Sequence, residues 1–255
     1  MRNQRTLVRM LAAICLLGTT GISTSACAGF LGFGGESWKE EVLLHDGSKM
    51  IITRSQTYGG RHEIGQPPPI KEHTITFTLP GSDKRITWTS EYGDDIGRTN
   101  FTLLGVHLLN GTPYVVTKPN LCLSYNKWGR PNPPYVFFKY DGKAWQRISL
   151  EEFPAEFKTI NVVVSLNRRD VEEMVKLGVV PAENMKARNG RLTQPELKTI
   201  LREPVNPNSD SLTSCLIPST AAAKLIAPEI DGKPLYYNWW PLAQEWLNKT
   251  YGAKK

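Results

Sequence analysis

The segment with the densest binding chemistry runs from Ser124 to Tyr135 and reads Ser-Tyr-Asn-Lys-Trp-Gly-Arg-Pro-Asn-Pro-Pro-Tyr. Aromatic rings of this kind stack on apolar ligand faces, while amide and guanidinium groups bond ligand hydroxyls. Three prolines stiffen the backbone, so we expect a rigid loop that presents a ligand surface. The alternative is a crossover whose rings pack on the core, with Arg130 stacked on one of them. The predicted contact residues of this segment are Tyr125, Asn126, Trp128, Arg130 and Tyr135.

A second polar loop, residues 58–69, mixes glycines, charges and the triple proline Pro67-Pro68-Pro69. Loops of this composition lie on the surface and often carry binding residues. We therefore assign Arg61, His62 and Glu63 to the same predicted binding surface. The sequence does not establish that the two loops are neighbours.

An acidic cluster, Glu91, Asp94 and Asp95, lies within Glu-Tyr-Gly-Asp-Asp-Ile-Gly. Carboxylates in pairs can bind calcium or serve as acid and base in sugar hydrolysis, here with His62 as a further candidate. The spacing is not that of an EF-hand, which makes Asp94 and Asp95 only weak calcium candidates. A solvated loop between strands is the simpler interpretation.

The remaining chemistry-bearing residues lack the spacing of known catalytic or cofactor sites. The four histidines are His45, His62, His73 and His107, and no two are spaced as in a zinc-binding helix. The sequence also lacks a Gly-x-Ser-x-Gly elbow, a P-loop and a dinucleotide-binding glycine motif. We therefore predict a non-catalytic protein that needs no cofactor and no metal.

The first 26 residues have the pattern of a secretory signal peptide. Arg2, Arg5 and Arg9 precede the short apolar run 11–17, and small residues follow. That run is too short to span a bilayer, which takes about 20 residues. The pattern predicts an exported protein.

The cleavage region allows two interpretations. Thr24-Ser25-Ala26-Cys27 resembles a bacterial lipobox, although Thr24 stands where leucine is usual. This resemblance implies lipidation of Cys27, with residues 27–37 as a flexible tether. Alternatively, Ala26-Cys27-Ala28 is an Ala-x-Ala site, and cleavage releases a free periplasmic or secreted chain.

Two cysteines, Cys122 and Cys215, remain beyond this region. A pair of cysteines in an exported chain favours a disulfide over two free thiols. Such a bond would tie the middle of the chain to its last third. It predicts that residues 38–255 form a single domain.

Alternating polar and apolar residues predict strands between about residues 36 and 166. Asp46-Gly47, Asn110-Gly111 and Asp141-Gly142 each separate two such segments, as hairpin turns do. The apolar run Ile160–Leu166 is expected to be a strand buried on both faces.

The last third carries helical patterns instead. Asp170-x-x-Glu173 and Thr193-x-x-Glu196 are capping-box patterns, and Gly178 is placed to end the first of these helices. Further helices are expected over 219–226 and 241–251. The predicted fold class is therefore α+β, with an antiparallel sheet or sandwich in residues 36–166 followed by a helical C-terminal third.

These patterns predict an exported bacterial envelope protein that holds a glycan or protein partner through its aromatic, proline-rich loop. The alternatives are an exported hydrolase with a carboxylate and histidine site, and a structural envelope lipoprotein. The expected location is an inner- or outer-membrane lipoprotein facing the periplasm, or a free periplasmic or secreted protein. Lys and Arg number 31 against 24 Asp and Glu, and three of these arginines lie in the signal segment. The remaining positive excess is mild and scattered, so no nucleic-acid partner is expected.

Overall fold

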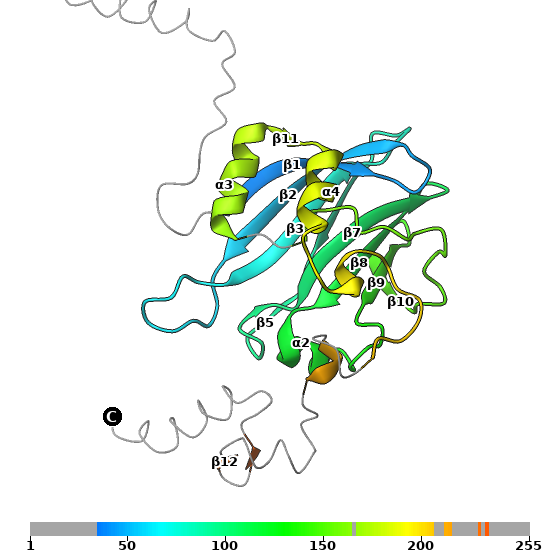
Figure 1. The fold of residues 1–255 in the computed structure, drawn as a ribbon. Helices are drawn as coiled ribbons and strands as arrows, with labels where there is room; N and C mark the ends of the chain where they lie inside the picture. The colour runs from blue at the N-terminus through cyan, green and yellow to red at the C-terminus, as the bar shows by residue number, and fades with distance from the viewer. Residues whose placement is uncertain (1–34, 165–166, 207–211, 216–228, 231–232, 235–255) are drawn as a thin grey trace, which may run out of the picture. The chain divides into compact units, whose positions relative to one another are not determined.

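The computed structural model describes residues 35–164, 167–206, 212–215, 229–230 and 233–234 (Figure 1). The predicted signal peptide, Cys27 and the helices expected over 219–226 and 241–251 lie outside these residues. Of the predicted tether, residues 36 and 37 belong to the first strand.

Most of the regular secondary structure in the described chain is β-strand, arranged in two main sheets (Figure 1). The five-stranded sheet has the order β11-β1-β2-β3-β4, and the four-stranded sheet has the order β10-β9-β8-β7. Neighbouring strands are antiparallel, apart from the parallel pair β1 and β11. Two small hairpins, β5 with β6 and β12 with β13, complete the strands. The strands are β1 (Glu36–Leu43), β2 (Lys49–Tyr58), β3 (Ile70–Thr78), β4 (Arg85–Thr89), β5 (Tyr92–Gly93), β6 (Arg98–Thr99), β7 (Phe101–Leu109), β8 (Thr112–Pro119), β9 (Val136–Tyr140), β10 (Trp145–Ile148), β11 (Val179–Val180), β12 (Glu229–Ile230) and β13 (Lys233–Pro234).

The two main sheets share one apolar core, as the predicted antiparallel sheet or sandwich requires. Ile52 and Ile75 from the five-stranded sheet belong to the same buried cluster as Val106 and Val115 from the four-stranded sheet. Alternation along each strand produces this arrangement, since every second side chain points to the same face. In β4, for example, Ile86 and Trp88 are buried and the residues between and beside them are exposed.

All three predicted hairpin turns are confirmed. The Asp46 carboxylate accepts a hydrogen bond from the Ser48 amide at 2.9 Å, and the turn joins β1 to β2. Asn110 and Gly111 both have positive φ angles, 50° and 73°, between β7 and β8. Asn-Gly suits this turn because both residue types tolerate the left-handed region. Gly142 occupies the third turn, between β9 and β10.

The predicted strand at Ile160–Leu166 is wrong for its described part, residues 160–164, which are buried but irregular. The reason is Asn161, whose side chain takes the place of strand pairing. Its Oδ1 accepts from the Val106 amide at 3.0 Å, and its Nδ2 donates to the carbonyls of Val106 at 2.8 Å and Leu43 at 3.1 Å. One side-chain amide thus links this segment to both sheets. Around it, a second apolar cluster packs with residues of β7, β8 and β9.

The described helices are short. They are α2 (Leu121–Lys127), α3 (Arg168–Leu177) and α4 (Ala182–Asn189), with single 3-10 turns at η1 (Pro195–Leu197) and η2 (Leu212–Ser214). Among the described residues, no helix has the length and hydropathy needed to cross a membrane.

The sequence predicted the end of α3 better than its start. Gly178 closes α3 with a φ of 74°, as expected. The capping box, however, joins Asn167 to Asp170, three residues before the predicted Asp170–Glu173 pair. Asn is as good an N-cap as Asp, so both registers satisfied the pattern. The second predicted helix is reduced to η1, and α4 was not predicted.

Cys122 and Cys215 form the predicted disulfide; they are 93 positions apart in the sequence, and their Cα atoms are 5.5 Å apart. The bond joins the start of α2 to the residue that follows η2. In the chain-entropy model, closing a loop of this length stabilises the folded state by about 4 to 5 kcal/mol.

Candidate functional site

The predicted binding loop is in part a helix, because α2 covers its first four residues. The prediction that its tyrosines are exposed is wrong. Tyr125 and Tyr135 are 2% and 3% exposed. The hydroxyl of Tyr135 donates to the carbonyls of Glu196 and Thr199, at 2.9 and 3.0 Å. Both rings therefore pack in the interior, which was the alternative interpretation of this segment.

Arg130 also follows that alternative, since its guanidinium lies over the Tyr125 ring at 4.9 Å. It donates to the Asn126 side chain at 2.5 Å and to the Cys215 carbonyl at 2.6 Å. Arg130 and Asn126 thus hold the segment beside the disulfide. Because Trp128 lies between Asn126 and Arg130 in the sequence, these contacts also hold its backbone in place.

Trp128 lines a hollow that we call the aromatic groove, which has a volume of about 230 Å³. The groove lies where the two sheets meet, since β4, β7, β9 and β10 each contribute a ring. It is lined by Trp88, Thr89, Glu91, Phe101, Trp128, Phe138 and Trp145.

The volume of the aromatic groove, about 230 Å³, is below the range of roughly 300–1,000 Å³ that is typical of pockets for drug-sized ligands. It is therefore large enough for one ring-sized group of a ligand. Trp88 and Phe101 form its buried floor, at 3% and 1% exposed. Trp128 and Trp145 are half-buried and form its walls.

Hydrogen bonds and ring contacts fix these walls. The Trp145 indole N–H donates to the Thr87 carbonyl at 2.7 Å. The hydrogen bond links Trp145 of β10 to the edge strand β4 of the other sheet. Trp128 packs against Phe101, with ring centroids 4.6 Å apart. Its own indole nitrogen is buried and has no hydrogen-bond partner among the described residues. The groove thus has rigid rings and one unused donor.

Charged groups surround the rings. The Arg147 guanidinium lies 5.3 Å from the centre of the Trp128 ring. Lys127 forms ion pairs with Glu91 at 3.1 Å and with Asp95 at 3.4 Å. Partial burial lowers the pKa of Lys127, but the interactions with Glu91 and Asp95 outweigh it and raise that pKa overall. The ammonium group therefore stays charged at neutral pH and orients both carboxylates.

This arrangement disfavours the hydrolase alternative. Glu91 and Asp95 are both engaged by the Lys127 ammonium group, at 3.1 and 3.4 Å, and are not arranged as a separate acid and base on two sides of a substrate site. His62 is exposed, and its Nδ1 lies 2.9 Å from the Gly60 carbonyl oxygen. Within the described residues, His62 has no hydrogen bond or ion pair with these carboxylates.

The calcium candidates Asp94 and Asp95 lie on the same loop. Their carbonyl oxygens accept hydrogen bonds from Arg61 at 3.0 and 3.4 Å. In the part of the chain that the structure describes, no group of three or more His, Cys, Asp or Glu residues is placed to hold a metal ion.

The two predicted binding loops meet the same intervening loop, residues 91–97. Arg61 contacts it from the first loop, and Lys127 contacts it from the end of α2. His62 and Glu63 are exposed and do not line the aromatic groove. The structure thus places Arg61 and Lys127, the neighbour of Trp128, in contact with the same loop. His62 and Glu63 lie outside the aromatic groove.

No protein-family model, curated protein or solved structure matches this chain. The function of the groove must therefore be argued from its own residues.

Sequence reasoning missed Trp88, Phe138, Trp145 and Arg147. A usable signal was present, because Trp145 follows the Asp141-Gly142 turn on a strand of only four residues. A short edge strand cannot bury a side chain of that size completely. What the sequence could not supply was the pairing order that places β4, β9 and β10 around Trp128.

A second titratable cluster was also missed. His73 and Lys118 line a hollow of about 300 Å³ between β3 and β8, and Lys118 lies 3.9 Å from Glu196. Burial lowers the pKa of Lys118. The Nδ1 of His73 and the Oε1 of Glu196 are buried without hydrogen bonds among the described residues. Burial also lowers the pKa of His73, to about 3, so this imidazole makes the stability of the fold depend on pH.

Proposed function

We propose that this protein is an exported, non-catalytic bacterial envelope protein that binds a glycan in the aromatic groove. The observation that carries the proposal is the group of half-buried rings, Trp128, Phe138 and Trp145, over a buried aromatic floor with ionic groups at the rim. Partly exposed rings offer apolar faces to a ligand, and rigid side chains lose little conformational entropy on binding.

In this proposal, one sugar ring of the glycan enters the groove and stacks on Trp145 and Trp128. The Glu91 carboxylate accepts a hydrogen bond from a sugar hydroxyl at the rim. The small volume limits the site to a single ring, so the rest of the glycan stays outside.

The sequence supports the envelope location through the signal pattern in residues 1–26 and the lipobox-like residues before Cys27. Attachment to a membrane is proposed only through lipid on Cys27. A free periplasmic or secreted form remains the alternative, and either form would face envelope glycans.

Replacing Trp145 by alanine is expected to weaken glycan binding by about five- to tenfold, because loss of one stacking ring costs roughly 1 to 1.5 kcal/mol. Binding is measured by co-sedimentation with purified peptidoglycan sacculi, with lipopolysaccharide as a second probe. Tyr58→Ala is the matched control, since Tyr58 is a half-buried ring outside the groove. Melting temperatures verify that both variants are folded.

Equal retention of Trp145→Ala and the wild-type protein on the glycan would contradict the proposal. Equal loss of binding in Tyr58→Ala would also contradict it, because the effect would then not belong to the groove. Retention of a single envelope protein in place of either glycan would favour the protein-partner alternative.

A further inference from the structure

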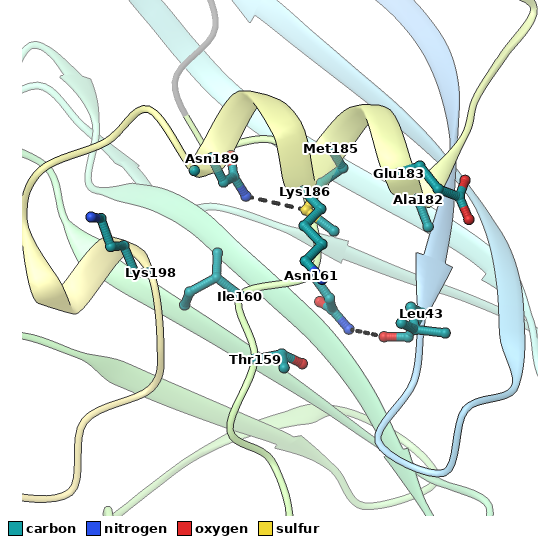
Figure 2. A pocket seen from close by; sticks show the side chains of 11 residues that line it. Leu43, Thr159, Ile160, Asn161, Ala182, Glu183, Met185, Lys186, Asn189 and Lys198 are labelled. Atoms are coloured by element: carbon teal, nitrogen blue, oxygen red, sulfur yellow. Dashed lines mark hydrogen bonds between the residues drawn. The ribbon is translucent and has the colours of Figure 1, made fainter.

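A separate and larger pocket, which we call the α4 pocket, lies between helix α4, the segment 159–161 and the end of β1 (Figure 2). Its volume is about 480 Å³, within the range of small-molecule sites. None of its lining residues belongs to the aromatic groove. It is therefore a distinct candidate site.

The walls of the α4 pocket are fixed by two asparagines whose polar atoms are already engaged. Asn161 binds the backbones of Val106 and Leu43, as described above. Asn189 donates to the Val162 carbonyl at 2.7 Å and accepts from the Val164 amide at 3.2 Å. Figure 2 shows these side chains on opposite sides of the pocket. Because their hydrogen bonds are internal, they rigidify the walls and leave little for a ligand to bond.

What the pocket offers a ligand is hydrocarbon. Leu43, Ile160, Ala182 and Met185 line it, and most of its accessible surface is apolar. Leu43 is 42% exposed, so its side chain offers apolar surface at the pocket. Covering such surface with an apolar chain removes it from water and is favourable.

The pocket is lined by two lysines and one acidic residue. Lys186 and Lys198 both line the pocket and are exposed, and neither forms an ion pair with any described residue. The acidic residue of the lining, Glu183, lies 3.4 Å from Lys49 and is partly neutralised by it. Figure 2 shows Lys198 and Glu183 at opposite ends, with Lys186 between them. An anion would therefore find two free ammonium groups at this mouth.

We propose that the α4 pocket binds a medium-chain fatty acid, with its hydrocarbon chain against Leu43, Ile160 and Met185 and its carboxylate near Lys186. The apolar walls favour the hydrocarbon chain of the fatty acid, and the lysines attract its carboxylate. The volume accommodates a single chain and excludes a lipid with two chains. Because the lysines are exposed, they contribute less to affinity than the chain does.

The test is isothermal titration calorimetry with decanoate, below its critical micelle concentration, and with decanol as the neutral counterpart. Decanoate is expected to bind at one site, and decanol is expected to bind at least about threefold more weakly. Absence of decanoate binding, or tighter binding of decanol, would overturn the proposal.

Two pairs of variants localise the binding. Leu43→Glu places a carboxylate in the pocket and is expected to weaken decanoate binding at least tenfold. Ile51→Glu is its control, because Ile51 is 46% exposed on the neighbouring strand and does not line the pocket. Lys186→Glu is expected to weaken binding severalfold, whereas Lys176→Glu on α3 leaves it unchanged. If Leu43→Glu and Lys186→Glu both bind decanoate as the wild type does, decanoate is not in this pocket.

Discussion

Replacing Arg54 by methionine is expected to lower the free energy of unfolding by about 3 to 5 kcal/mol, as breaking a buried ion pair does. Arg54 and Glu40 are 2% and 1% exposed, and their side chains meet at 2.8 Å. Glu40 also accepts from the Trp38 indole at 2.7 Å and from the Val163 amide at 3.2 Å. Without Arg54, this carboxylate stays buried with its countercharge gone.

Urea unfolding measures the effect, and two variants serve as controls. The double variant Glu40→Gln with Arg54→Met removes both charges but keeps a side-chain acceptor for Trp38 and Val163, and it is expected to be more stable than Arg54→Met alone. Lys49→Met removes the cation of an ion pair at the surface, where the Lys49 side chain is 46% exposed, and should destabilise the fold far less than Arg54→Met does. A loss of less than about 1 kcal/mol in Arg54→Met would contradict the account of this pair.

Acidification from pH 7 to pH 5 is expected to destabilise the fold through His73 and His107. Burial lowers the pKa of each imidazole to about 3, against about 6.5 in an unfolded chain. Between these values the unfolded chain binds more protons than the folded one. The stabilisation is therefore complete above pH 6.5 and falls as the pH falls. Over this interval each histidine accounts for a loss of about 2 kcal/mol.

The measurement is the free energy of unfolding as a function of pH. His107→Gln is expected to flatten the curve between pH 7 and 5, whatever its effect on stability at pH 7. An unaltered slope in both His73→Gln and His107→Gln would show that other groups cause the acid sensitivity.

The sequence predicted the local features of the fold well. Turn residues specify hairpins through their own backbone preferences, and Asp46-Gly47 and Asn110-Gly111 illustrate this. It failed where a tertiary contact replaces a local one. The apolar run from Ile160 resembles a strand, yet Asn161 bonds two sheets through its side chain, and no local pattern contains that information.

The candidate site was predicted only in part. Trp128 lies in the aromatic groove, but Tyr125 and Tyr135 face the interior. The sequence could not distinguish these cases, because an aromatic-rich segment has the same composition whether its rings are buried or exposed. Trp145 was missed because its role depends on how two edge strands approach each other. Composition indicated the region, and only the sheet order identifies the groove.

The central claim is that a glycan binds in the aromatic groove, and the most direct test is a titration of the ¹⁵N-labelled protein with soluble peptidoglycan fragments, followed by NMR of the tryptophan indoles. The account predicts saturable shifts of the Trp128 and Trp145 indole signals, with the signal of the buried Trp38 unchanged. Indole signals of Trp128 and Trp145 that stay constant at saturating fragment concentrations would contradict it.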